Sequence, residues 1–277
     1  MIRWFLRGLS RSRVTTRYPR GEERPPAGFR ARALLERELE REAIGPDDAA
    51  ALAATCLPGA LTVTATGSLR LDGSRCIGCG LCVAASNGHA VTIDPSYETA
   101  TRSRERLLAD DGDREADVAA APLTGPFRRS LHIRHVDTGS DGAVEQEIAA
   151  LLNPYYDMQR LGLFFTASPR HADVLLVTGP VTRPMEAPLR RTYEAMPEPR
   201  VVVAAGTDAC SGGIWTGPEV LGGVDRVLAV DVYIPGDPPS PIALLHGLLL
   251  AAGRVPEASA PRVDAAATGA QRARGAA

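Results

Sequence analysis

Four cysteines in one short region are the residues best suited to chemistry. Cys76, Cys79 and Cys82 are spaced C-x-x-C-x-x-C, and Cys56 lies upstream of them. Thiolates are soft ligands, and three at this spacing can wrap one loop around an iron–sulfur cube. The spacing therefore indicates a metal site rather than a secreted disulfide scaffold, and it favours a reducing compartment.

The cysteine run resembles that of the bacterial ferredoxins. In that family a fourth cysteine and a proline follow the run, and the fourth cysteine ligates the other cluster. Here those two positions hold Ser86 and Asn87, whereas A-T-C-L-P-G-A-L-T-V resembles the end of a first run. The resemblance implies that Cys56 is the swapped ligand. It implies one 4Fe-4S cluster, held by Cys56, Cys76, Cys79 and Cys82.

None of the four ligand positions of a second ferredoxin cluster holds a cysteine. By the same resemblance they fall at Pro46, Ala49, Leu52 and Ser86, none of which is expected to bind iron. One cluster has thus lost every ligand while the other keeps all four. Zinc is the alternative for the remaining set, because structural zinc sites also use four cysteines. The tripled run and the following V-T-I-D favour iron–sulfur.

The elements that must position these residues follow from composition and pattern. A chain of 277 residues with 44% hydrophobic and 23% charged residues predicts about two soluble domains. The net charge of −2 offers no argument for nucleic acid as a partner. We expect no secretory leader at the start, and the longest apolar stretch is too short to span a bilayer.

The pattern along the chain divides it into five parts. We expect an arginine-rich extended arm at 1–45, a ferredoxin-like 4Fe-4S domain at 46–95 and a linker at 96–128. Apolar strands alternate with helices over 129–255, which indicates a flavodoxin-like parallel sheet covered on both faces. A disordered tail is expected at 256–277. The fold class is therefore α/β, with the iron–sulfur domain first.

Residues 130–252 resemble the B-type subunit of NADH-quinone oxidoreductase and the small subunit of group 4 nickel–iron hydrogenases of the formate hydrogenlyase type. The matching text includes H-V-D-T-G-S, L-N-P-Y-Y-D-M-Q-R-L-G, A-D-V-L-L-V-T-G-P-V-T-R and V-Y-I-P-G-D-P-P-S-P. The N-terminal half resembles the I-type subunit, the ferredoxin-like partner in the same complexes. The chain thus resembles a fusion of the two subunits.

The resemblance to the B-type subunit implies a cluster site whose ligands are missing here. In that family G-S-C-x-x-C-E, G-x-C-A-x-x-G-G and P-G-C-P-P supply four cysteines at sheet-end loops. The corresponding positions are Asp141, Val144, Asp208 and Asp237, and Cys210 is out of register. Carboxylates are hard ligands, so this cluster is expected to be absent. The aspartates are either simply hydrated or form a site for a hard cation or a proton.

These resemblances imply an iron–sulfur subunit of a complex I-like or membrane-bound hydrogenase-like oxidoreductase, not catalytic alone. Its expected partners are a large hydrogenase-like or quinone oxidoreductase subunit and, through the complex, membrane-embedded subunits. Its expected place is cytoplasmic, peripheral to the inner face of the membrane. The alternative is a non-redox structural or assembly subunit that kept the fold and its partners.

Overall fold

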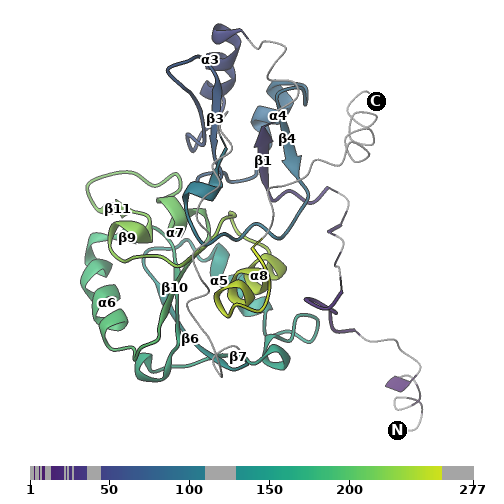
Figure 1. The fold of residues 1–277 in the computed structure, drawn as a ribbon, viewed down its shortest axis with the longest axis vertical. Helices are drawn as coiled ribbons and strands as arrows, with labels where there is room; N and C mark the ends of the chain where they lie inside the picture. Colours follow the sequence, from purple (N-terminus) through teal and green to yellow (C-terminus); the bar gives the residue numbers. More distant parts are fainter. Residues whose placement is uncertain are drawn as a thin grey trace.

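The computed structural model describes residues 14–21, 28–35, 45–109 and 129–257, with a few single positions before residue 28. Much of the expected arm at 1–45 lies outside the described residues. So do residues 110–128 of the expected linker and residues 258–277 of the expected tail. In Figure 1 the chain folds as two units, with the elements labelled α3, α4, β1, β3 and β4 in the upper one and a larger sheet below.

The lower unit is built on a five-stranded parallel sheet, which we call the sheet domain (residues 129–257). Its strands are β6 (Leu131–Asp137), β7 (Leu163–Phe165), β8 (Val174–Thr178), β10 (Val201–Ala205) and β12 (Val232–Ile234). They lie in the order β7-β6-β8-β10-β12, and all four pairs are parallel. This is the flavodoxin-like order 2-1-3-4-5. The expected flavodoxin-like α/β architecture is confirmed.

Helices cover both faces of this sheet. Helices α5 (Ala143–Ala150) and α8 (Pro241–Ala251) pack with side chains such as Leu176 and Val203, and α6 (Arg183–Glu194) packs with the alternate ones such as Leu175 and Val202. Strands buried on two faces must be apolar at every position, which is why β8 and β10 read as unbroken runs. A Cβ on Gly247 would lie 2.3 Å from Ile234 Cδ1, so α8 packs very closely on β12.

Shorter elements complete the sheet domain. They are α7 (Thr207–Ser211), the antiparallel pair β9 (Val181–Thr182) and β11 (Val220–Gly222), and the 3-10 helices η3 (Met158–Leu161), η4 (Pro169–His171) and η5 (Val224–Arg226). None of the described helices is both long enough and apolar enough to cross a membrane.

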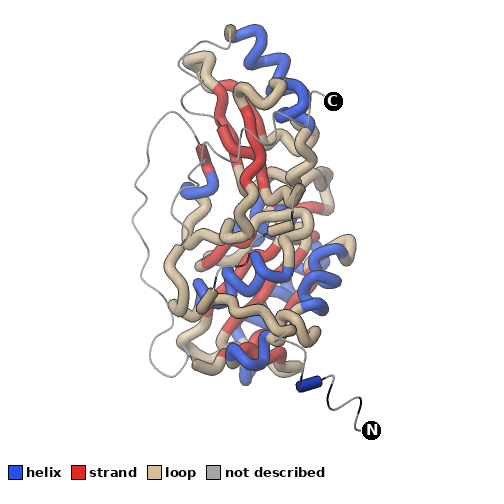
Figure 2. The backbone as a smooth tube through the Cα atoms, turned by 90° about the vertical axis from the view of Figure 1, so that its right-hand side faces the viewer, coloured by secondary structure: helices blue, strands red, loops and turns tan. Residues whose placement is uncertain are grey.

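The upper unit, which we call the cysteine unit (residues 28–109 where described), contains two small antiparallel sheets. One pairs β1 (Arg32–Leu35) with β4 (Val91–Asp94), and the other orders β2 (Leu61–Val63), β3 (Leu69–Asp72) and β5 (Leu108–Ala109). Helices α3 (Pro46–Ala54) and α4 (Leu81–Ala85) and the 3-10 helix η1 (Glu105–Leu107) complete it. Figure 2 shows these elements stacked along the long axis above the main sheet.

Two parts of the cysteine unit differ from the boundaries that composition predicts. Strand β1 lies within 1–45, where we expected an extended arm, because the short run around Ala33 is averaged out by the arginines around it. Residues 96–109, where we expected a linker, also contact the sheet domain. Thr101 pairs with Tyr233 by two backbone hydrogen bonds, and Arg104 bonds Asp225 at 2.7 Å while lying 3.6 Å from Asp72. This segment joins the two units.

Candidate functional site

Cys56 and the three cysteines of the C-x-x-C-x-x-C run come from three neighbouring segments of the cysteine unit. Cys56 follows α3, Cys76 and Cys79 lie in the loop between β3 and α4, and Cys82 is in α4. Cys76 and Cys82 are each 8% exposed and belong to the core of the unit, Cys56 is half-buried and Cys79 is exposed. The sulfurs therefore span the boundary between core and surface.

Backbone N–H groups point at two of these sulfurs. Ala33 N–H donates to Cys76 Sγ at 3.3 Å, and Leu61 N–H donates to Cys56 Sγ at 3.4 Å. Such bonds favour the thiolate form, which is the form that binds metal. Strand β1 thus contributes directly to the cysteine site, although the sequence pattern gave no sign of it.

Cys76 and Cys82 lie close enough to the other cysteines for their ionisation to be affected. The pKa of Cys82 is raised to about 11, mainly by burial and then by the charges of Cys76, Cys56 and Cys79. Burial also raises the pKa of Cys76, with Cys56 and Cys79 adding to the shift. Without a bound cation these buried thiols stay protonated at neutral pH, so metal binding must release protons and must weaken as pH falls.

The four positions at which a second ferredoxin cluster would need cysteines hold residues that are part of the fold of the cysteine unit. Ala49 and Leu52 are buried in the core of the cysteine unit, Pro46 is the first residue of α3, and Ser86 Oγ donates to the Val83 carbonyl. None of the three α3 positions where a cluster would need thiolates holds a cysteine. Nothing at these positions offers a soft ligand.

The second candidate region is the carboxyl edge of the parallel sheet. We call its three loops, 139–145 after β6, 206–213 after β10 and 235–240 after β12, the rim. Asp141, Asp208 and Asp237 lie one in each loop, as the doubly wound fold predicts for residues that follow its strands. Val144 is 5% exposed, and a Cβ on Gly206 would lie 2.8 Å from its Cγ2. It fills space inside the rim.

Asp208 is the most perturbed carboxyl group of the rim. The pKa of Asp208 is raised to about 6. Burial is the largest cause, and the charges of Asp237 and Asp141 add to it. A hydrogen bond from Trp215 Nε1 at 2.8 Å opposes the shift. Partial desolvation, followed by the charge of Asp141, raises the pKa of Asp237. A Cβ on Gly213, at φ +59°, would lie 1.8 Å from Asp208 Oδ1, so glycine is required there. The sequence pattern did not single out Trp215.

Replacing Asp208 by asparagine should stabilise the protein above pH 6 and not below pH 4. The folded pKa of about 6 exceeds the ordinary 3.8, so the unfolded chain ionises first and wild-type stability falls as pH rises through this window. Each pKa unit corresponds to about 1.4 kcal/mol, and solvent screening reduces the gain to about 1–2 kcal/mol. Asparagine keeps an acceptor for Trp215. Urea unfolding of Asp208→Asn and wild type at several pH values measures the difference.

The control for this prediction is Asp157→Asn, which lies outside the rim at φ +44°, a conformation that asparagine tolerates. It measures the effect of the same substitution on the free energy of unfolding at a site away from the rim. An Asp208→Asn effect that is the same at pH 4 and pH 8 would contradict the assigned cause.

A polar network lies behind the first rim loop. Glu145 accepts hydrogen bonds from Ser140 Oγ at 2.5 Å and from the Thr178 hydroxyl, and His135 Nε2 lies 2.9 Å from that hydroxyl and 3.6 Å from Glu145. Burial lowers the pKa of His135, with Glu145 opposing the shift. This carboxylate is therefore tied into the domain rather than directed at the rim aspartates.

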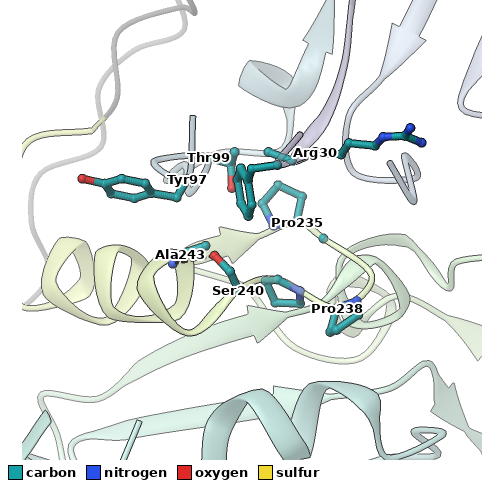
Figure 3. A pocket seen from close by; sticks show the side chains of 11 residues that line it. Arg30, Tyr97, Thr99, Pro235, Pro238, Ser240 and Ala243 are labelled. Atoms are coloured by element: carbon teal, nitrogen blue, oxygen red, sulfur yellow. Dashed lines mark hydrogen bonds between the residues drawn. The ribbon is translucent and has the colours of Figure 1, made fainter. Parts of the chain in front are cut away.

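A small cavity lies between the third rim loop and the cysteine unit. Figure 3 shows Pro235, Pro238 and Ser240 on one side and Tyr97 and Thr99 on the other. Its volume is about 50 Å³, which suits water rather than a nucleotide or quinone. Arg30 borders it but extends away, and its guanidinium donates to the Cys79 carbonyl at 3.1 Å.

Within the described part of the chain, no three His, Cys, Asp or Glu side chains converge closely enough to hold one metal ion. A mononuclear zinc site needs four sulfurs about 2.3 Å from a single point. The described cysteines do not have that arrangement, and neither do the rim aspartates.

Comparison with known proteins identifies the sheet domain. The model of the family described as "NADH ubiquinone oxidoreductase, 20 Kd subunit" matches residues 142–251. The probable membrane-bound hydrogenase subunit mbhJ of Pyrococcus furiosus is 44% identical over 124 residues, which are 44% of this chain and 74% of that protein. The chain belongs to the NADH ubiquinone oxidoreductase 20 Kd subunit family. The resemblance to the B-type subunit and to group 4 hydrogenase small subunits is thereby confirmed.

Two further relatives are matched over about half their length. Formate hydrogenlyase subunit 7 of Escherichia coli K12 is 43% identical over 134 residues, 48% of this chain and 52% of that protein. The B-type subunit of the NADH-quinone oxidoreductase of Citrifermentans bemidjiense is 52% identical over 94 residues, 34% of this chain and 55% of that protein. The family match contains Val144, Asp208 and Asp237 but does not extend to the cysteine unit.

Proposed function

We propose that this chain is an iron–sulfur subunit of a complex I-like or membrane-bound hydrogenase-like oxidoreductase and carries one 4Fe-4S cluster. The observation that carries the proposal is the grouping of Cys56, Cys76, Cys79 and Cys82 in one unit, within electrostatic reach of one another. Bound there, the cluster would accept and release single electrons.

The cysteine site has the properties that such a cluster requires. Its donors are four soft thiols, two of them buried and two receiving backbone N–H bonds. Each thiolate of a cube binds a different iron, so the sulfurs need not converge on one point as they must around zinc. The order of elements around the cysteines supports a ferredoxin-like unit.

The four ligand positions of the rim hold no cysteine, and Cys210 lies in the core of the sheet domain, so we propose that the second cluster of the family is absent here. Electrons reaching this chain would then stop at the cysteine unit, or leave it for a partner by a route other than the rim. We propose a large hydrogenase-like or quinone oxidoreductase subunit as that partner, in a complex peripheral to the cytoplasmic face of the membrane. The names of the relatives, which are subunits of a formate hydrogenlyase, a membrane-bound hydrogenase and an NADH-quinone oxidoreductase, support the partner class and the association with a membrane.

The rim aspartates support a second candidate function, the uptake and release of a proton. Asp208 has its pKa raised to about 6 by burial and by its two acidic neighbours, which places it near working pH. The described side chains of the rim are not arranged around a single ion, so we favour a proton over a cation.

A redox titration of the anaerobically reconstituted protein, followed by paramagnetic resonance, tests the main function. We expect one centre that is reduced and reoxidised reversibly by one electron. If the protein instead binds a metal that no mediator reduces, such as zinc, the cysteine site would have only a structural role.

A further inference from the structure

A buried threonine of the sheet domain bonds directly to the cysteine loop. Thr207 is 0% exposed and is the first residue of α7, in the second rim loop. Its hydroxyl lies 3.2 Å from the Cys76 carbonyl oxygen and accepts the Gly236 N–H at 3.3 Å, while its own N–H donates to the Gly236 carbonyl at 2.8 Å. Because the hydroxyl has one hydrogen, that hydrogen is donated to Cys76.

Two further groups hold the same segment. Ser211 Oγ lies 2.9 Å from both the Ser74 and the Thr207 carbonyl oxygens, which share its one hydrogen, and it accepts the Gly213 N–H at 3.2 Å. Arg75 reaches in the opposite direction, since its guanidinium donates to the Gly213 carbonyl at 3.5 Å and to the Pro58 carbonyl at 2.9 Å. Three successive residues, 74 to 76, are thus bonded to one rim loop.

The same contacts connect the two parts of the cysteine site. Pro58 lies two residues after Cys56, and Arg75 directly precedes Cys76. The guanidinium of Arg75 therefore links the turn that carries Cys56 with the loop that carries Cys76, while Gly213 anchors both to the sheet domain. A ligand's orientation depends on the groups that hold it, and such groups tune metal sites.

We propose that the rim loop 206–213 is a supporting part of the iron–sulfur site, with Thr207 as the positioning residue that fixes Cys76. The inference rests on the proposed function and extends it: the site depends on both units of the chain. The rim has no cysteine in register but acts on the cluster through hydroxyl-to-carbonyl bonds.

The test compares Thr207→Val, Thr207→Ser and Thr138→Val after anaerobic reconstitution. Valine matches threonine in shape but cannot donate, so the buried Cys76 carbonyl loses its partner. We expect the cluster of Thr207→Val to bleach about fivefold faster in air, with altered resonance g-values and a shifted reduction potential. Thr207→Ser should restore all three. Thr138→Val is the control, because Thr138 is equally buried and its hydroxyl bonds carbonyls inside the sheet domain.

Each result bears on the inference. If Thr207→Val has the same bleaching rate, g-values and reduction potential as wild type, the inference is overturned and the proposed function stays intact. Wild-type protein that takes up no iron overturns both. If Thr207→Val fails to fold, Ser211→Ala provides the same comparison from a half-buried position. Wild-type bleaching, g-values and reduction potential in Ser211→Ala would equally overturn the inference.

Discussion

Replacing Cys56 by alanine should abolish the four-iron centre while leaving the chain folded. Cys56 Sγ accepts the Leu61 N–H, and its charge acts on Cys76 and Cys82, although it precedes the cysteine run by several elements. A cube with three protein thiolates has one iron open to solvent, so we expect iron and sulfide to fall several-fold and the visible absorption to be lost. Iron and sulfide assays of the purified variant measure the loss.

Cys210→Ala is the matched control for this experiment. Cys210 is 0% exposed in the core of the sheet domain, where burial raises its pKa and its thiol lies 3.6 Å from the Ala204 carbonyl. Its removal costs some packing but no metal ligand. A full complement of iron in Cys56→Ala, or its loss in Cys210→Ala, would contradict the ligand assignment.

The second large effect is a gain of metal. Restoring cysteine at the four degenerate positions, in the variant Asp141→Cys, Val144→Cys, Asp208→Cys and Asp237→Cys, should raise the iron content from about four to about eight per chain. The rim loops still follow β6, β10 and β12, and the three aspartates already interact electrostatically. Thiolates in these places would supply the soft ligands that carboxylates do not.

A variant with serine at the same four positions controls for the loss of charge and bulk. It should keep about four irons, like wild type. A cysteine variant that folds, judged by its unfolding midpoint, yet stays at the wild-type iron content would show that the rim has lost the geometry of a cluster site and not only its ligands.

Much of the sheet domain could be predicted from its residues because burial on two faces leaves a strong pattern. The runs that became β8 and β10 are almost entirely apolar and are each followed by a glycine, and β6 alternates Leu131 and Ile133 with polar residues. The run Leu163–Phe165 that forms the edge strand β7 is only three residues long and was not predicted. Helix α6 begins at Arg183, where the following Pro184 suits the first turn of a helix.

The contacts between the two units could not be predicted in the same way. Thr207 and Cys76 are 131 positions apart, and their bond joins a side chain to a backbone carbonyl. Such a carbonyl carries no sequence signal, since every residue has one. The same holds for Ala33, whose N–H reaches the Cys76 sulfur from a strand hidden in an arginine-rich stretch. Residue spacing indicated which side chains could bind iron, but the groups that orient them required the three-dimensional structure.

We propose that the thiols of a single cluster remain in this chain and that all of them lie in the cysteine unit. The iron and acid-labile sulfide content of anaerobically prepared wild-type protein tests this proposal, together with the resonance spectrum of the reduced form. We predict about four irons and four sulfides per chain and a single reduced centre. About eight irons with two interacting centres, or zinc in place of iron, would contradict the proposal.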